Sequence, residues 1–279
     1  MANKQALKQR IKSISTTKKI TGAMEMIANS KLTKLKNKAE EGRTYTDTLK
    51  EIVSDIMASN PHLDNKFFKK NNSSESVTIV FCSDIGMCGG YNAHVLDLIK
   101  KEVDKSSKIL LVGTKLDSDL VKEGYKFLKE PIEGENIDFE TIKHIGRTVT
   151  KMYVKGQIGR IDVVYTEFIN TLTFKPVKET VLPYSPDKAT KKKSNVETIF
   201  EPSADVIIDN IIPLMVDNYL YSVAQRSKVS EYASRRAAME NATDNAEELV
   251  EDLTLKYNQA RQQSITQEIT EIVAGADAI

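Results

Sequence analysis

The C-terminal quarter of the chain is the feature that most limits its fold. From Ala204 to Ile279 the sequence holds one proline, Pro213, and one glycine, Gly275, so it predicts helix almost throughout. At 1.5 Å per residue such a helix would reach on the order of 100 Å, more than one domain of this size can enclose. We therefore expect it to project from the fold into something else. Pro213 should kink this helix or delay its start by one turn.

The two ends of the chain are complementary in charge and similar in apolar spacing. Residues 1–38 hold ten Lys or Arg and one acid, whereas residues 240–279 hold nine acids and two basic residues. Apolar residues recur three, four or seven apart in both, which predicts an antiparallel two-helix coiled coil held mainly by packing. The predicted stripes are Leu7, Ile11, Ile14, Ile20, Met24, Ile27, Leu35, Leu49, Ile52 and Ile56, and Met239, Ala242, Ala246, Leu249, Leu253, Tyr257, Ala260, Ile265, Ile269 and Ile272.

The middle of the chain is typical of a Rossmann-like α/β domain. The first helix should end near Ser59 because Asn60 and Pro61 follow it, and residues 60–76 should form a polar linker. Strands are predicted at 77–82, 108–113, 160–169 and 172–182, the last two paired as a hairpin, and helices at 93–104 and 138–155. This alternation favours a mostly parallel sheet. The predicted segments are 1–59, a linker 60–76, the α/β domain 77–200 and the C-terminal helix 201–279, and the lysine run 191–193 lies in a loop.

Composition excludes several classes of protein. With 40% hydrophobic and 28% charged residues, the chain has no stretch apolar enough to span a bilayer, and its first residues do not resemble a signal peptide. Two cysteines, Cys82 and Cys88, make no disulfide framework, which indicates a reducing, cytosolic setting. The three histidines lack metal-ligand spacing, so we expect no metal site.

Residues 83–92 (SDIGMCGGYN) form the one segment of the α/β domain that could carry chemistry. They lie between the first strand and its helix, where backbone N–H groups commonly hold a phosphate. Their glycine spacing matches neither G-x-G-x-x-G nor a P-loop, however, which favours a tight turn that shapes a surface. Cys88 could be a nucleophile only with His94 as its base, and a plain surface thiol is the simpler interpretation.

Four segments in order resemble the γ subunit of F-type ATP synthases. They are residues 18–31 (KKITGAMEMIANSK), 83–92, 241–246 (NATDNA) and 260–276 (ARQQSITQEITEIVAGA), and the last is the most specific. The resemblance implies a rotor shaft. Its terminal helices enter a ring of three α and three β subunits, and its α/β foot sits with ε on the ring of c subunits. It also implies no catalytic site or cofactor of the chain's own, and membrane association at the cytoplasmic face through partners alone.

The resemblance also implies particular contact residues. Basic shaft residues face an acidic loop of β, the segment near residue 262 hydrogen-bonds a catching loop of β, and the nearly uncharged end of the chain, Val273 and 275–279, suits an apolar sleeve. The implied ring contacts are Lys8, Arg10, Lys12, Lys18, Lys19, Met24, Arg261, Gln262, Thr266, Glu268, Ile269 and Ile272, and the implied contacts to ε and the c ring are Asp84, Gly89, Gly90, Tyr91, Asn92 and Glu201.

The sequence departs from the family pattern in two places. Ile85 stands where the family often has arginine, and Leu32 and Thr33 stand where it often has methionine and arginine, so individual ionic contacts differ. The cysteine-bearing insertion of the chloroplast relatives is missing, and thiol regulation of that type is not expected.

Two other classes of protein stay open. A basic coiled coil could bind nucleic acid, but residues 1–38 contain no aromatic residue to stack on a base, and the acidic C-terminal helix should answer much of their charge. An α/β enzyme with helical dimerisation arms would need a paired base and nucleophile, which the sequence does not offer.

Overall fold

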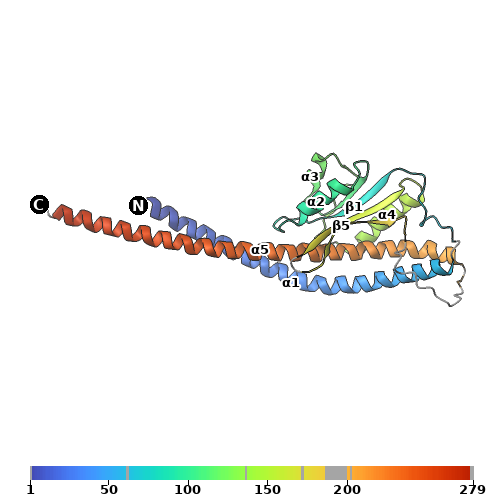
Figure 1. Cartoon of the computed structure of the whole chain (residues 1–279), viewed down its shortest axis with the longest axis horizontal. Coiled ribbons are helices and arrows are strands. Elements are labelled where there is room, and N and C mark those ends of the chain that lie inside the picture. Colours follow the sequence, from blue (N-terminus) through green and yellow to red (C-terminus); the bar gives the residue numbers. More distant parts are fainter. Residues whose placement is uncertain are drawn as a thin grey trace. The chain divides into compact units, whose positions relative to one another are not determined.

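Two long helices begin and end the protein. The structure is a computed structural model that describes residues 2–60, 63–135, 137–170, 173–185, 200–201 and 203–276. Helix α1 spans Ala2–Ser59 and helix α5 spans Ala204–Ala276 (Figure 1). Contacts divide the chain into two compact units: unit 1 is Met1–Asn29 with Arg235–Ile279, and unit 2 is Ser30–Ser234. Both helices therefore contribute to both units. The sequence-based segment boundaries follow helix ends rather than these contacts, and they stay predictions.

Unit 2 contains a five-stranded sheet. Its strands are β1 (Ser76–Phe81), β2 (Lys108–Val112), β3 (Lys126–Phe127), β4 (Arg160–Phe168) and β5 (Phe174–Leu182), in the order β3-β2-β1-β4-β5. The first four are parallel and β5 pairs antiparallel with β4, which confirms the mostly parallel sheet and the hairpin. The predicted start of the last strand, residue 172, lies outside the described residues, as does the lysine run 191–193.

Helices cover both faces of this sheet. One face packs on α1, α5 and α4 (Phe139–Val154), and the other on α2 (Tyr91–Glu102) and α3 (Asp117–Lys122). Strand residues alternate between the two layers: Val77, Ile79 and Phe81 join the first, and Val80 and Cys82 the second. This alternation follows from the two-residue period of a strand. The part of α5 in unit 2 is thus a core helix.

Local signals explain where the helices begin and end. Asp138 caps α4 by accepting the N–H of Thr141 at 2.8 Å, and the Ser203 Oγ accepts the N–H of Val206 at the start of α5. The expected delay of this helix at Pro213 is wrong, because α5 already begins at Ala204 and includes the proline. Short elements α3 and β3 were not predicted.

The segment 60–76, predicted as a polar linker, contains one buried aromatic residue, Phe67, which is 1% exposed.

In unit 1, α1 and α5 pack as the predicted antiparallel coiled coil. The Lys18 ammonium lies 2.6 Å from the Glu247 carboxylate, and the Thr243 hydroxyl donates to the Thr21 hydroxyl at 2.8 Å. Residue numbers rise on one helix as they fall on the other, which fixes the antiparallel direction. The described part of the chain contains no helix long and apolar enough to cross a membrane.

The buried seam of unit 1 differs in detail from the predicted stripe. Thr21 and Ala28 are buried, whereas the predicted Ile20 and Ile27 are 55% and 58% exposed. On α5 the seam continues through Met239 and Ala246, while Leu249 is 51% exposed, and Ile52 of unit 2 is also exposed. Small side chains fill the seam because they let the two backbones approach closely. The apolar residues beside it remain uncovered.

One buried carboxylate in unit 2 predicts an unusual pH dependence of stability. Asp217 on α5 is 5% exposed and packs against Gly146 of α4, with its Oδ2 3.7 Å from the Arg147 guanidinium. Burial raises the pKa of this carboxyl from 3.8 to about 6, and the nearby Arg147 and Lys143 only partly oppose the shift. The folded chain therefore holds this proton more tightly than the unfolded chain does. The contribution of Asp217 to stability falls as pH rises from about 4 to about 6 and stays low above that range.

We expect Asp217→Asn to stabilise the chain at pH 7.5 by about 1–3 kcal/mol and to have little effect at pH 4. Urea denaturation of the full chain at both pH values measures the change. Asp209→Asn on the same helix is the matched control with opposite sign. Burial would raise the pKa of Asp209, but hydrogen bonds from Asn65 and Lys66 outweigh it and lower the pKa. Equal stability of Asp217→Asn and the native chain at pH 7.5 would contradict the assignment.

Candidate functional site

The carboxyl edge of the sheet contains the position where α/β domains most often bind ligands. The chain passes from β1 to β2 on one side, while β4 lies on the other side of β1, so the connection that follows β1 is a topological switch point. This connection, residues 83–90, turns tightly: Met87 and Gly89 have φ of 60° and 57°. Glycine adopts this left-handed conformation without strain. The connection leads directly into α2 at Tyr91.

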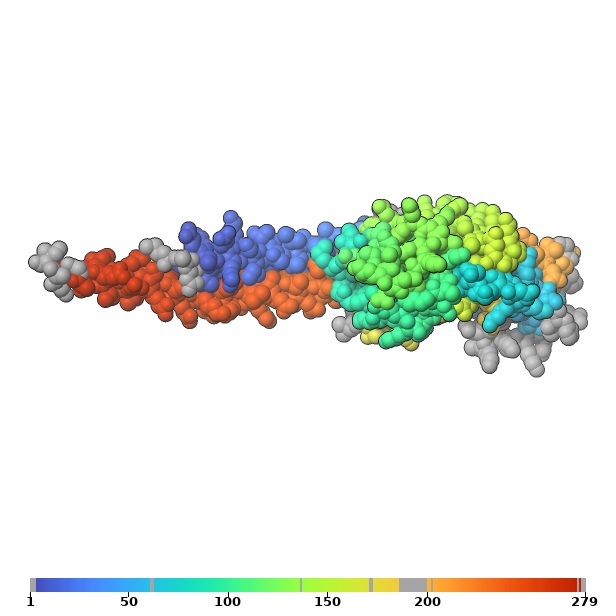
Figure 2. Space-filling view, turned by 90° about the horizontal axis from the view of Figure 1, so that it is seen from above, coloured from blue at the N-terminus to red at the C-terminus, as the bar shows by residue number. Residues whose placement is uncertain are grey.

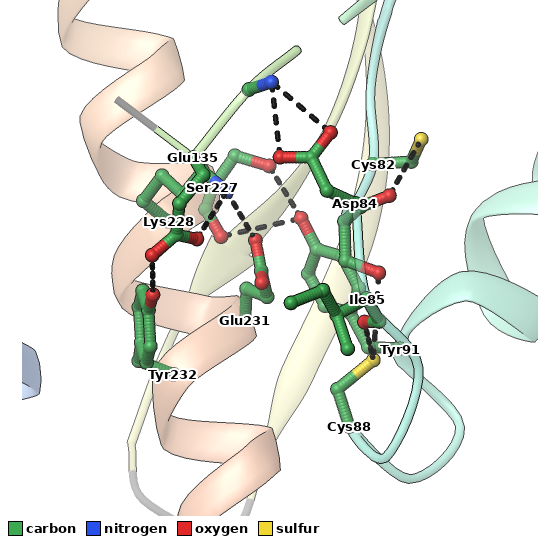
Figure 3. Close-up of polar contacts among 12 residues, drawn as sticks. Cys82, Asp84, Ile85, Cys88, Tyr91, Glu135, Ser227, Lys228, Glu231 and Tyr232 are labelled. Carbon is green, nitrogen blue, oxygen red and sulfur yellow. Dashed lines mark hydrogen bonds and ion pairs between the residues drawn. The ribbon is translucent and has the colours of Figure 1, made fainter. Parts of the chain in front are cut away.

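Side chains of α5 and α2 fill this position (Figure 3). The Tyr91 hydroxyl lies 2.8 Å from the Ser227 hydroxyl, and the Ser234 hydroxyl donates to the carbonyl of Cys88 at 2.7 Å. Asn92 accepts the N–H of Ser83 and donates to its hydroxyl. The cavity left among these elements has about 10 Å³, enough for roughly one water molecule. The structure therefore favours the tight turn over the nucleotide site.

Both thiols of this region are buried. Cys82 and Cys88 are 3% and 1% exposed, and burial raises the pKa of the Cys82 thiol to about 12. The Cys88 sulfur accepts a hydrogen bond from Asn92 at 3.3 Å. The interpretation of Cys88 as a surface thiol is wrong, because the connection folds it inward. The same burial keeps a substrate away from the sulfur and weakens the interpretation as a nucleophile.

A buried charged cluster lies beside this turn, and the sequence analysis missed it. Lys228 and Glu231 on α5 form an ion pair at 2.8 Å although their side chains are 9% and 1% exposed. Glu135, in the connection between β3 and α4, lies 3.8 Å from the same Lys228 ammonium. A lysine and a glutamate three apart inside an otherwise buried helix segment were the available sequence signal. The contribution of Glu135 could not be read from the sequence, because it comes from a distant loop.

The predicted shaft residues in the first helix are mostly exposed. Among the described residues, Lys8, Arg10, Lys12 and Lys19 form no ion pair, so their charges face outward. Lys18 differs, since it pairs with Glu247. The expectation that acidic residues of the C-terminal helix neutralise much of this positive charge is therefore wrong for these four residues. Met24 is half-buried beside the exposed Met26.

The end of α5 is a bare helix. From Ile265 on, every described side chain is exposed, and Ile269, Ile272 and Val273 are 56%, 71% and 54% exposed. The antiparallel register places residue 2, where α1 begins, opposite roughly residue 262. Helix α1 therefore does not run alongside the segment from Ile265 on. Figure 2 shows the N-terminal segment along α5 and the red end without such cover. Arg261, Gln262, Thr266 and Glu268 are exposed on the same stretch, and residues 277–279 lie outside the described part.

The remaining predicted contacts do not form one site. Asp84, Gly89, Gly90, Tyr91 and Asn92 lie on or beside the turn that packs on Ser227 and Ser234, and Asp84 accepts the N–H of Gly134. Glu201 instead precedes the first turn of α5. The helix between these points rises about 35–45 Å. The structure therefore brings the turn residues together and leaves Glu201 at the other end of unit 2.

Comparison with known proteins agrees over the whole length. A family model described as ATP synthase matches residues 3–279. The ATP synthase gamma chain of Desulforamulus reducens is 36% identical, with 100% of both chains covered, and that of Clostridium acetobutylicum is 38% identical, with 98% of this chain and 97% of the relative covered. The gamma chain of Mesoplasma florum is 37% identical over 100% of this chain and 99% of its own.

Solved structures share the fold at lower identity. A chain of the Euglena gracilis mitochondrial ATP synthase rotor aligns with a TM-score of 0.64 and 14% identity, covering 95% of this chain and 99% of its own. A chain of the Tetrahymena thermophila mitochondrial ATP synthase central stalk and c-ring structure aligns with a TM-score of 0.59 and 24% identity, covering 80% and 99%. The family model and the identities of 36–38% over 98–100% of this chain show that it belongs to the family of ATP synthase gamma chains.

Proposed function

We propose that this chain is the central rotor shaft of an F-type ATP synthase. It couples ion flow through a membrane ring of c subunits to ATP synthesis or hydrolysis in a ring of three α and three β subunits. The observation that carries the proposal is the bare end of α5, where Ile265, Ile269 and Ile272 are exposed on a helix that α1 does not cover. Such an end suits a surrounding apolar surface, and the ATP synthase family model matches the chain through residue 279.

A two-helix shaft has the asymmetry that this function requires. It has no threefold axis, so inside a ring of three equivalent catalytic sites it contacts each site differently. Differential contact shifts conformational equilibria. A difference of about 1.4 kcal/mol in contact energy changes a site's nucleotide affinity tenfold, so a few polar contacts can hold the three sites in distinct states. Rotation of the shaft then exchanges these states in sequence.

The proposed ring contacts are shaft side chains that are exposed, together with the half-buried Lys18 and Met24. The outward-facing ammonium and guanidinium groups of α1 suit an acidic loop of β, since a lysine follows a moving carboxylate surface without a fixed geometry. The polar groups near residue 262 suit hydrogen bonds to a second loop of β, and the apolar end suits a sleeve. The proposed set is Lys8, Arg10, Lys12, Lys18, Lys19, Met24, Arg261, Gln262, Thr266, Glu268, Ile269 and Ile272.

The segment just before α5 is the proposed contact to the membrane ring of c subunits. Glu201 is exposed just before α5 begins. The turn at residues 83–92 lies about 35–45 Å further along α5, so we propose that it contacts a subunit other than the c ring. The ε subunit and the α and β subunits complete the partners, and the chain reaches the cytoplasmic face of the membrane only through them.

We further infer that the chain has no catalytic site of its own. The filled switch point supports this, because Tyr91, Lys228 and Glu231 occupy the space that a substrate would take. ATP chemistry belongs to the surrounding subunits. Assembly of the purified chain with α and β subunits, followed by observation of ATP-driven rotation, tests the function directly. An assembled ring that hydrolyses ATP while this chain stays still would overturn the proposal.

We expect Met24→Lys to lower the number of ions pumped per ATP hydrolysed by roughly severalfold, because a new ammonium beside the β surface competes with the existing cations. Ion pumping and ATP hydrolysis in membrane vesicles that contain the assembled complex measure this ratio. Met24→Leu keeps the volume and should leave the ratio unchanged. A normal ratio in the lysine variant would remove Met24 from the contact set.

Deletion of residues 272–279 should weaken torque or assembly while the rest of the chain stays folded. The deleted part has no buried described side chain, so its loss should change the free energy of unfolding by less than about 1 kcal/mol. Single-molecule torque in the assembled ring and denaturation of the free chain separate the two effects. Ile272→Leu is the size-matched control. Unfolding of the α/β domain in the truncated chain would contradict the two-part architecture.

A further inference from the structure

One carboxylate of the α/β domain contacts both long helices at once. Glu135 lies in the connection between β3 and α4, and Lys31 of α1 and Tyr232 of α5 both donate to its Oε1. Lys228 of α5 approaches its Oε2 at 3.8 Å. The Lys31 ammonium also donates to the Tyr232 hydroxyl at 2.9 Å, so the two helices are joined to each other at the same point (Figure 3 labels Glu135, Lys228 and Tyr232).

The charges of this cluster balance without help from solvent. Lys31 and Lys228 carry positive charge, and Glu135 and Glu231 carry negative charge. The exposed fraction of the side chain falls from 46% at Lys31 and 30% at Glu135 to 9% at Lys228 and 1% at Glu231. The pairs are therefore partly withdrawn from water. In such surroundings, hydrogen bonds between charged groups are strong and directional. Loss of one carboxylate would leave buried Lys228 with excess positive charge.

The main chain beside Glu135 is also held in place. The N–H of Gly134 donates to both carboxylate oxygens of Asp84, at 3.1 and 3.0 Å. Asp84 follows β1, the central strand of the sheet. A force on the sheet therefore reaches Glu135 through a short, hydrogen-bonded path rather than through a free loop.

Apolar packing holds the helices on the sheet without directional bonds. The layer of α1, α4 and α5 against the sheet is a large apolar cluster, and the hydrophobic effect that holds it has no preferred direction. Other polar contacts tie α5 alone to the sheet, such as Arg226 to Glu167 and the Ser230 hydroxyl to the carbonyl of Thr166. Glu135 differs because it engages both helices, so it opposes rotation of either helix against the domain.

We propose that Glu135 is a positioning residue for energy coupling, which transmits torque between the α/β domain and the helix pair by clasping Lys31, Lys228 and Tyr232. The inference rests on the proposed rotor function and adds to it the residue through which the domain grips the shaft. The clasp sets the torsional stiffness of unit 2. It does not touch nucleotide, and ATP hydrolysis without load does not depend on it.

The test measures stiffness in the assembled rotor. The ring is fixed to a surface, and a probe is attached to the α/β domain through Val121→Cys on α3, where the native side chain is 57% exposed and both native cysteines are buried. With the motor stalled, the variance of the probe angle reports torsional compliance. We expect Glu135→Ala to raise this variance roughly twofold and Glu135→Gln to raise it less, because the amide oxygen still accepts from Tyr232.

Two further variants keep the test decisive. Glu140→Ala breaks an exposed ion pair with Lys143 on α4 and should leave the variance unchanged. If Glu135→Ala fails to fold, Tyr232→Phe removes one hydroxyl donor and should give an intermediate increase. A melting temperature lowered without any change in variance, or equal variance in Glu135→Ala and Glu140→Ala, would overturn the clasp. A native chain that does not rotate in the ring would instead refute the rotor function itself.

Discussion

The structure depends on how α5 changes from a core helix of unit 2 to one of the two helices of the coiled coil in unit 1. A long isolated helix gains little stability from its own hydrogen bonds, so its packing decides where it is stable. In unit 2, residues such as Ile212, Leu220 and Val223 are fully buried against the sheet, α1 and α4. In unit 1 only a narrow seam is buried, and after Ser264 none of the described side chains is. Stability therefore decreases along the helix, and exposure for partners increases.

The α/β domain shows how a fold that commonly binds nucleotides can serve as a mechanical part. Its switch point is present, with the tight turn and the helix that follows it, but Tyr91, Ser227 and Glu231 occupy the ligand's place. The polar groups that would otherwise hold a substrate bind side chains of α5 instead. The same strand geometry that positions catalytic groups in related folds here positions Asp84 against the main chain of Gly134, next to Glu135, which contacts α1 and α5.

Much of this fold could be predicted from the sequence because its signals are local. Apolar runs gave β1, β2 and β4, the predicted helix 138–155 matches α4 within about one residue at each end, and the Asn60–Pro61 pair marked the end of α1. The seam of unit 1 was less accessible, because Ile20 and Thr21 fit similar spacings and only the partner helix decides between them. Glu135 could not be predicted as a contact residue, since its three partners, Lys31, Lys228 and Tyr232, lie about 100 residues away in sequence.

Because the end of α5 is not covered by other parts of the described chain, its helical order depends on the subunits that surround it. Within this segment the described side-chain bonds are local, such as the Thr266 hydroxyl to the carbonyl of Gln262 and the Gln267 amide to Glu271. A side-chain pair such as Gln267 and Glu271 contributes about 0.2–0.5 kcal/mol, less than the cost of ordering the residues that make it, and the Thr266 bond to its own helix backbone adds no net stability. Burial of Ile269 and Ile272 in a sleeve would contribute roughly 1.5–3 kcal/mol each. The free chain should therefore fray at this end, and the surrounding ring would stabilise the part of the helix that turns within it.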